Sequence, residues 1–188
     1  MHDAIVLAGG AATRLGGAAK PQLAIAGRTL LDHAVAAVGD AECVVVVGPD
    51  QPVDAPVVFC REQPPGGGPV AAIAAGLVHT RADVVVVLAA DLPFVAPAVP
   101  RLLDALPAVG VALLVDESGR PNYLAAAWRR ASLASALQRL GEAAGASMRA
   151  LIDFVPHVLV PDEAGWGRDC DTWEDFDQAR AEREVPDA

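Results

Sequence analysis

Short apolar runs alternate along this chain with longer segments of helical periodicity. Near-continuous valine runs such as Val44–Val47 and Val84–Val87 are typical of central parallel strands that are covered on both faces. Strands are predicted at 4–7, 43–47, 57–59, 84–88, 111–115, 124–128 and 157–160, and helices at 29–38, 69–78, 97–106, 132–140, 148–154 and 173–184. This order predicts an α/β fold, a three-layer Rossmann-like open sheet that is mostly parallel.

The chain is long and apolar enough for one domain. Its 188 residues are 53% hydrophobic and show no linker or internal repeat, so we expect a single domain over 1–188. No apolar run reaches the roughly 18 residues that span a bilayer, and the first strand starts too early for a signal peptide, so we expect no membrane partner. Cys43, Cys60 and Cys170 are widely spaced. We expect the first two to be buried, reduced thiols and the protein to be cytoplasmic.

The charge of the chain narrows the function classes. A formal net charge of −10 opposes sequence-independent binding of nucleic acid, and 4% aromatic residues predict no base-stacking platform. The histidines form neither a His-Glu-x-x-His motif nor a cluster with cysteine, which argues against a zinc site. There is no Gly-x-Ser-x-Gly elbow of a serine hydrolase. An acidic chain that binds a polyanionic nucleotide must gather its cations locally and recruit a metal ion.

A glycine-rich loop with two cations follows the first predicted strand. Ala8-Gly9-Gly10 ends the strand, and Arg14, Gly16-Gly17 and Lys20 come next. Glycines let phosphate oxygens approach the main chain, and the cations neutralise a polyphosphate. The spacing matches neither Gly-x-x-x-x-Gly-Lys-[Ser/Thr] nor Gly-x-Gly-x-x-Gly. We therefore predict a phosphate-binding loop of another kind; the alternative is an ordinary strand–turn–helix with solvated basic residues.

Three further loops carry candidate chemistry at the expected carboxyl ends of strands, where parallel sheets bind their ligands. The glycines 66–68 precede a helix and could let the backbone pack against a flat base, or simply form a tight loop. Asp91 follows a buried strand and precedes Leu-Pro, which predicts a ligand for a hard cation, with an Asx-turn as the alternative. Asp171, rather than Asp169, is predicted as the second ligand because it directly precedes a helix cap; a purely capping role is the alternative.

These groups together predict nucleotidyl transfer by positioning and electrostatics. One or two carboxylates plus substrate phosphates are the usual ligands of Mg²⁺, which we expect as the cofactor on Asp91 and Asp171. Arg14 and Lys20 would stabilise the transition-state oxygens, so Arg14, Lys20 and Asp91 are the predicted catalytic residues. A phosphate monoester acceptor is already ionised at neutral pH and needs no general base.

Taken in order, the motifs resemble those of nucleotidyltransferases with a nucleotide-diphospho-sugar transferase fold, and among these the MobA-like molybdenum cofactor guanylyltransferases. The resemblance covers nearly the whole chain. The matching segments are Leu7-Ala-Gly-Gly with Arg14 and Lys20, Gly67-Gly68-Pro69, Ala90-Asp91-Leu-Pro-Phe94, Asn122 with Ala125-Ala126-Ala127-Trp128, Ser147-Met-Arg149, and Asp171-Thr172. It implies this fold and a Mg²⁺-dependent transfer of GMP from GTP to the terminal phosphate of molybdopterin. It also implies a molybdoenzyme or other cofactor-biosynthesis proteins as partners.

The resemblance also assigns binding residues, with some departures. The nucleotide-binding positions that it implies are Leu7, Ala8, Gly9, Gly10, Lys20, Glu62, Gly68 and Asp91, and the acceptor-binding position is Asn122. Gly48 stands where the family often has a base-contacting Asn, and Ala19 replaces the Asp that commonly precedes the lysine. Lys20-Pro21 is a pattern shared with cytidylyltransferases. The alternatives left open are a cytidylyltransferase that acts on molybdopterin or another small phosphate, and a non-catalytic nucleotide-binding protein of the same fold.

Overall fold

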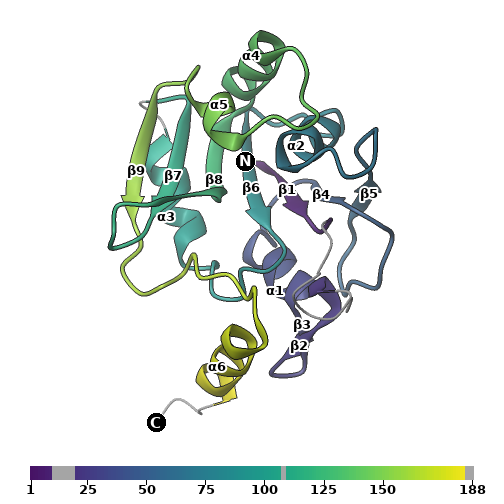
Figure 1. Ribbon diagram of the computed structural model, residues 1–188, viewed down its shortest axis with the longest axis vertical. Coiled ribbons are helices and arrows are strands. Elements are labelled where there is room, and N and C mark those ends of the chain that lie inside the picture. Colours follow the sequence, from purple (N-terminus) through teal and green to yellow (C-terminus); the bar gives the residue numbers. More distant parts are fainter. Residues whose placement is uncertain (10–19, 107–108, 185–188) are drawn as a thin grey trace.

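The computed structural model describes residues 1–9, 20–106 and 109–184, and its centre is a seven-stranded sheet (Figure 1). The strands are β1 (Asp3–Leu7), β4 (Val44–Val47), β5 (Val58–Cys60), β6 (Val84–Ala89), β7 (Val111–Val115), β8 (Pro121–Arg129) and β9 (His157–Pro161). Their order across the sheet is β5-β4-β1-β6-β8-β7-β9. All neighbours are parallel except β8, which runs antiparallel to both β6 and β7.

Helices cover both faces of this sheet. They are α1 (Leu30–Ala37), α2 (Pro69–Leu77), α3 (Ala98–Ala105), α4 (Arg130–Leu140), α5 (Met148–Ile152) and α6 (Trp173–Glu184). Side chains alternate along β1, so Ala4 and Val6 pack in one core with α1 and α3, while Ile5 and Leu7 pack in the other with α2, α4 and α5. The predicted α/β fold with three layers and a mostly parallel sheet is therefore confirmed.

A smaller cluster extends the fold beyond the carboxyl ends of the parallel strands. The hairpin of β2 (Ala24–Ile25) and β3 (Arg28–Thr29) lies beside α6 below the sheet in Figure 1. Its buried members come from the hairpin, α1, α6 and the segment before α6: Ile25, Leu30, Cys170, Phe176 and Ala179. This cluster holds α6 close to the carboxyl edge of the sheet, where the predicted site residues lie.

A capping box fixes the start of α6. The Thr172 hydroxyl accepts a hydrogen bond from the Asp175 amide at 3.2 Å, and the Asp175 carboxylate accepts one from the Thr172 amide at 2.8 Å. Two backbone donors that the first helical turn cannot satisfy internally are thus paired. Because Asp171 comes directly before Thr172, the capping box also helps to fix the position of the Asp171 backbone.

Several expectations from the sequence need correction. The β2–β3 hairpin was not predicted, and β8 begins at Pro121 rather than Leu124. Cys43 and Cys60 are half-buried rather than buried, because one lies at the entry to β4 and the other on the edge strand β5, while Cys170 is the buried thiol. Within the described residues, no helix is both long and apolar enough to cross a membrane.

Candidate active site

The site lies at the point where the chain reverses its direction across the sheet. From β1 the chain moves to β4 and β5 on one side, and then returns to β6 on the other side of β1. Ligands of open parallel sheets bind in the crevice at such a switch point. The loops that leave β1 and β6 here carry Ala8-Gly9 and Ala90-Asp91, and the Ala90 amide donates to the Leu7 carbonyl at 3.0 Å. Two predicted loops are therefore neighbours.

Three predicted residues from distant segments meet at this crevice. The Lys20 ammonium lies 2.5 Å from Oδ2 of Asp91 and 2.6 Å from Oδ1 of Asp171. Lys20 begins the 3-10 helix Lys20–Gln22, Asp91 follows β6, and Asp171 precedes α6. The Lys20 side chain is 16% exposed, that of Asp91 23% and that of Asp171 47%, so the group opens toward solvent on the Asp171 side. Lys20 is also the only lysine in the sequence.

The charges of this cluster favour a protonated Lys20. Burial lowers the pKa of the Lys20 ammonium, but the hydrogen bonds and charges of Asp171 and Asp91 outweigh it and raise that pKa above its ordinary value. Burial, with the negative charges of Asp171 and Asp91, raises the pKa of the nearby Asp169 carboxyl. Burial and the Asp91 carboxylate raise the pKa of the Cys170 thiol to about 11, so this cysteine stays a thiol. Positive charge at Lys20 is strongly favoured.

The donor set fits a hard divalent cation. Carboxylate oxygens of Asp91 and Asp171, from different segments, converge on one cation, which is the Lys20 ammonium in this structure. In the described part of the chain, no group of three or more His, Cys, Asp or Glu side chains forms a metal cage. Mg²⁺ does not need one, because it is usually bound by one or two carboxylates together with substrate phosphates.

A close backbone contact supports the start of the glycine-rich loop. The Gly48 amide donates to the Cys60 carbonyl at 2.9 Å, at the carboxyl end of β4. A Cβ on Gly48 would lie 2.8 Å from the carbonyl carbon of Ala8 and 3.0 Å from the Gly9 amide. Any side chain at this position must displace that backbone. Because position 48 is glycine, where the family often has asparagine, the Ala8-Gly9 peptide can pack tightly against it.

The second glycine loop lies between β5 and α2. Oε1 of Glu62 accepts a hydrogen bond from the Gly66 amide at 2.9 Å, so this carboxylate helps to shape the loop. Gly68 is the N-cap of α2 with φ +86°, a conformation that favours glycine, and it offers no side chain to cap the helix. The Gly67 carbonyl accepts from the Gly145 amide at 2.8 Å, which ties the loop to the segment before α5. The roles of Glu62 and Gly68 in nucleotide binding stay predictions.

Asn122 has local partners within the chain. Its Nδ2 donates to the Gly167 carbonyl at 3.0 Å, and its Oδ1 accepts from the Leu124 amide at 3.0 Å. The same loop is braced by Asp162, whose carboxylate accepts from the amides of Trp166 and Gly167. Asn122 therefore holds the 162–168 loop beside the start of β8, and its contact with the acceptor stays a prediction.

Some predicted residues lie outside the described part of the chain. Arg14 and Gly10, together with Gly16-Gly17 and Ala19, fall in residues 10–19. Two residues that border the site were not indicated by the sequence: Arg168 and Arg183 both lie over the ring of Phe94. Such cation–π contacts join residues more than 70 positions apart and leave no periodic signal in the sequence.

Comparisons with known proteins bear on this geometry. The family model described as "MobA-like NTP transferase domain" matches residues 4–158. The molybdenum cofactor guanylyltransferase of Acidiphilium cryptum (strain JF-5) is 35% identical over 154 residues, which cover 76% of this chain and 74% of that relative.

Two solved structures show the same fold. The molybdopterin-guanine dinucleotide biosynthesis protein A of Archaeoglobus fulgidus is similar with a TM-score of 0.73 and 22% identity, covering 95% of this chain and 97% of that one. The 2-C-methyl-D-erythritol 4-phosphate cytidylyltransferase of Thermus thermophilus is similar with a TM-score of 0.72 and 24% identity, covering 98% of this chain and 100% of that one.

Proposed function

Since the chain belongs to the family of MobA-like NTP transferase domains, we propose that it is a molybdenum cofactor guanylyltransferase. In the proposed reaction an oxygen of the terminal phosphate of molybdopterin bonds to the α-phosphorus of GTP, and the bond from that phosphorus to the bridging oxygen breaks. Pyrophosphate leaves, and the guanine dinucleotide form of the cofactor remains. The observation that carries the proposal is the cluster of ion pairs that Lys20 forms with Asp91 and Asp171 at the switch point of the sheet.

Each group has a proposed role. Asp91 and Asp171 would hold Mg²⁺, which when bound offsets negative charge on the phosphates. Lys20 moves its charge toward the phosphate oxygens and stabilises them as the leaving pyrophosphate takes up charge. Arg14, which lies outside the described residues, is proposed to stabilise the same phosphate oxygens. The chain has a formal net charge of −10, so binding a polyanionic nucleotide depends on local positive charge, which these cations supply.

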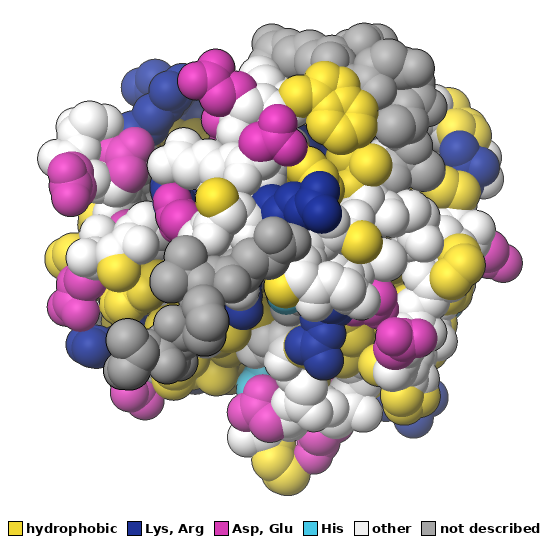
Figure 2. Space-filling model, turned by 90° about the horizontal axis from the view of Figure 1, so that it is seen from below, with side chains coloured by type: hydrophobic (Ala, Val, Ile, Leu, Met, Phe, Trp, Pro, Cys, Tyr) yellow, Lys and Arg dark blue, Asp and Glu magenta, His cyan; other side chains and the backbone are white. Residues whose placement is uncertain are grey.

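Binding contacts complete the proposal. The backbone of Leu7, Ala8, Gly9 and Gly10 would bring amides close to the phosphates, as glycine-rich loops do at strand ends. Figure 2 views the molecule from the α6 end and shows basic side chains set among acidic and hydrophobic ones on this face. Such a mixed face suits a site that binds a polyanion together with a cation.

The remaining binding roles come from the family resemblance. Glu62 and Gly68 are proposed to contact the nucleotide, and Asn122 the acceptor. The product would pass to a molybdoenzyme or another cofactor-biosynthesis protein. The free thiols of Cys43, Cys60 and Cys170 support a cytoplasmic location as part of the proposal.

A second candidate is transfer of CMP from CTP. The tight contact of Gly48 with Ala8 and Gly9 leaves no room for a base-reading side chain at that position, so this position does not select guanine. The cytidylyltransferase of Thermus thermophilus has the same fold, which is compatible with either reaction.

A panel of nucleotides distinguishes the two candidates. A ligand that binds the native state raises the free energy of unfolding, by about 2.7 kcal/mol when it is present at 100 times its Kd, and so raises the melting temperature. For a chain of this size that equals roughly 5–10 °C. We expect GTP with Mg²⁺ to give the largest shift in a thermal-shift assay, since a site that pairs with guanine leaves groups unpaired with other bases. A shift with CTP and none with GTP would move the assignment to CMP transfer.

A further inference from the structure

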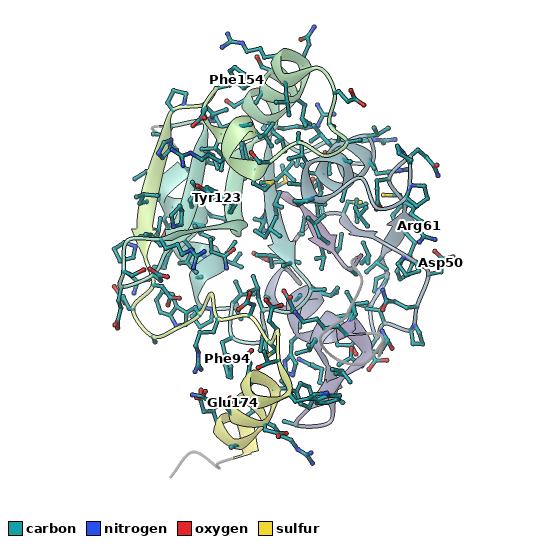
Figure 3. The ribbon with its side chains drawn as sticks, viewed as in Figure 1. Asp50, Arg61, Phe94, Tyr123, Phe154 and Glu174 are labelled. Atoms are coloured by element: carbon teal, nitrogen blue, oxygen red, sulfur yellow. The ribbon has the colours of Figure 1, made fainter. Side chains whose placement is uncertain are left out.

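Two guanidinium groups lie over the ring of Phe94. Phe94 comes three residues after Asp91, and Figure 3 shows it beside α6. The Arg168 guanidinium carbon lies 4.9 Å from the ring centroid and that of Arg183 lies 5.1 Å away. Both distances are within the range of a cation–π interaction. We call Phe94, Arg168 and Arg183 the Phe94 clamp.

Each arginine of the clamp is itself fixed. The Arg168 guanidinium forms a two-pronged pair with Glu182 of α6, with Nη1 donating to Oε1 at 3.0 Å and Nη2 donating to Oε2. Arg183 donates from Nη2 to the carbonyl of Pro93, next to Phe94 itself. The guanidinium planes are thus oriented, and little side-chain freedom remains to be lost when they meet the ring.

The clamp joins the two segments that carry the site carboxylates. Asp91 precedes Phe94 by three residues, and Asp171 follows Arg168 by three residues. Between them, the Cys170 amide donates to the Asp91 carbonyl at 3.2 Å. The family match ends at residue 158, so the segment that supplies Asp171 lies outside it. The Cys170–Asp91 hydrogen bond and the Phe94 clamp thus both link the segment of Asp171 to that of Asp91.

Like charges act against this arrangement. The carboxylates of Asp91 and Asp171 both contact the Lys20 ammonium, at 2.5 and 2.6 Å, so they lie close to each other. Repulsion between these carboxylates tends to move the 169–171 segment away from the β6 loop whenever no cation lies between them. Arg168, from the segment before α6, and Arg183, from α6, link this part of the chain to the β6 loop through the Phe94 ring.

We propose that Phe94 is a positioning residue for the two-carboxylate site. By binding Arg168 and Arg183, its ring keeps Asp171 within reach of the cation that Asp91 binds. This inference deepens the proposed function and rests on it for turnover. The effect on cation binding itself involves no nucleotide and can be measured separately.

The test is Phe94→Leu, which keeps an apolar side chain but removes the aromatic face. We expect Mn²⁺, measured by electron paramagnetic resonance without nucleotide, to bind about tenfold more weakly. Phe94→Tyr keeps the ring face and should restore wild-type binding. In turnover, the Mg²⁺ concentration for half-maximal rate should rise by a similar factor, while kcat at saturating Mg²⁺ stays close to that of the wild type.

Phe154→Leu is the matched control. Phe154 is also a partly exposed phenylalanine, but it lies after α5 at the opposite end of the molecule from Phe94 (Figure 3). Equal Mn²⁺ affinity of Phe94→Leu and Phe154→Leu would overturn the positioning role. Hydrogen exchange at residues 169–173 in the ligand-free protein gives an independent readout: Phe94→Leu should speed it relative to Phe154→Leu, and unchanged exchange would also overturn the proposal. If Mn²⁺ binding follows the clamp but GMP is not transferred, the proposed function fails and the clamp stands.

Discussion

Replacing Lys20 with alanine should lower kcat for nucleotidyl transfer by about 10²–10³-fold, the range seen when one preorganised charge-stabilising donor is removed from an active site. The ammonium lies 2.5–2.6 Å from both site carboxylates, at the crevice that parallel sheets use for their ligands. It is the only lysine of the chain, so within the sequence no other lysine can take over its role. Release of pyrophosphate from GTP in the presence of acceptor measures the effect.

Two variants separate this role from general effects on the protein. Lys20→Arg keeps the charge, although its planar fork differs from a compact ammonium, and should retain more activity than Lys20→Ala. Arg101→Ala removes an exposed cation that pairs with Glu163 at 3.4 Å on the surface, and should leave kcat within about twofold. Lys20→Ala also deprives two carboxylates of a shared partner, at a cost of about 1–3 kcal/mol in the free energy of unfolding, so its melting temperature must be measured as well. Wild-type turnover in Lys20→Ala would remove Lys20 from the catalytic groups.

Asp91→Asn should raise the Mg²⁺ requirement at least about tenfold and lower kcat by about 10²-fold. The amide keeps the size of the side chain and its ability to form a turn, but it loses the negative charge. The backbone bond from the Cys170 amide to the Asp91 carbonyl does not involve the side chain, so the fold should persist. A Mg²⁺ titration of pyrophosphate release at saturating GTP gives both quantities.

The matched variants for Asp91 are other aspartates. Asp171→Asn should show a weaker form of the same defect, because Asp171 is more exposed and amide oxygens can also bind Mg²⁺. Asp153→Asn changes an exposed acid directly before Phe154, which lies at the end of the molecule opposite Phe94 (Figure 3), and should leave the titration unchanged. A normal Mg²⁺ titration for both Asp91→Asn and Asp171→Asn would show that these residues only shape turns.

Much of the fold could be predicted because the strong signals are local. The valine runs at β4 and β6 are apolar on both faces, as central strands between two helical layers must be. The orientation of β8 could not be predicted in this way, since an apolar run such as Ala125–Trp128 looks the same in a parallel and in an antiparallel strand. What decides it is the short turn of residues 116–120, where the Gly119 amide bonds to the Asp116 carbonyl. A connection that short joins antiparallel neighbours.

The hairpin of β2 and β3 was missed for a related reason. Two residues per strand leave no measurable alternation, and the turn signal is a single glycine. Ala26 and Gly27 have φ values of +50° and +74°, as the tight two-residue turn requires. Alanine is seldom found in this conformation, so its presence in the sequence does not indicate a turn.

The candidate site was predictable in its residues but not in its contacts. Lys20 stands out as a cation of the glycine-rich loop, Asp91 as an acid after a buried strand and Asp171 as an acid before a helix. The structure brings the three together at the switch point. The sequence carries no information on the Phe94 clamp or on the bonds of Asn122, because both depend on where the 162–184 segment packs.

Transfer of a labelled α-phosphate tests the proposed function most directly. The protein is incubated with Mg²⁺, molybdopterin and GTP that carries ³²P at the α-phosphate, and the products are separated by chromatography. We expect the label in a molybdopterin–guanine dinucleotide and unlabelled pyrophosphate in equal amount, with no such product from Lys20→Ala on the same time scale. Label that stays in GTP, while α-labelled CTP gives a dinucleotide under the same conditions, would contradict guanylyl transfer.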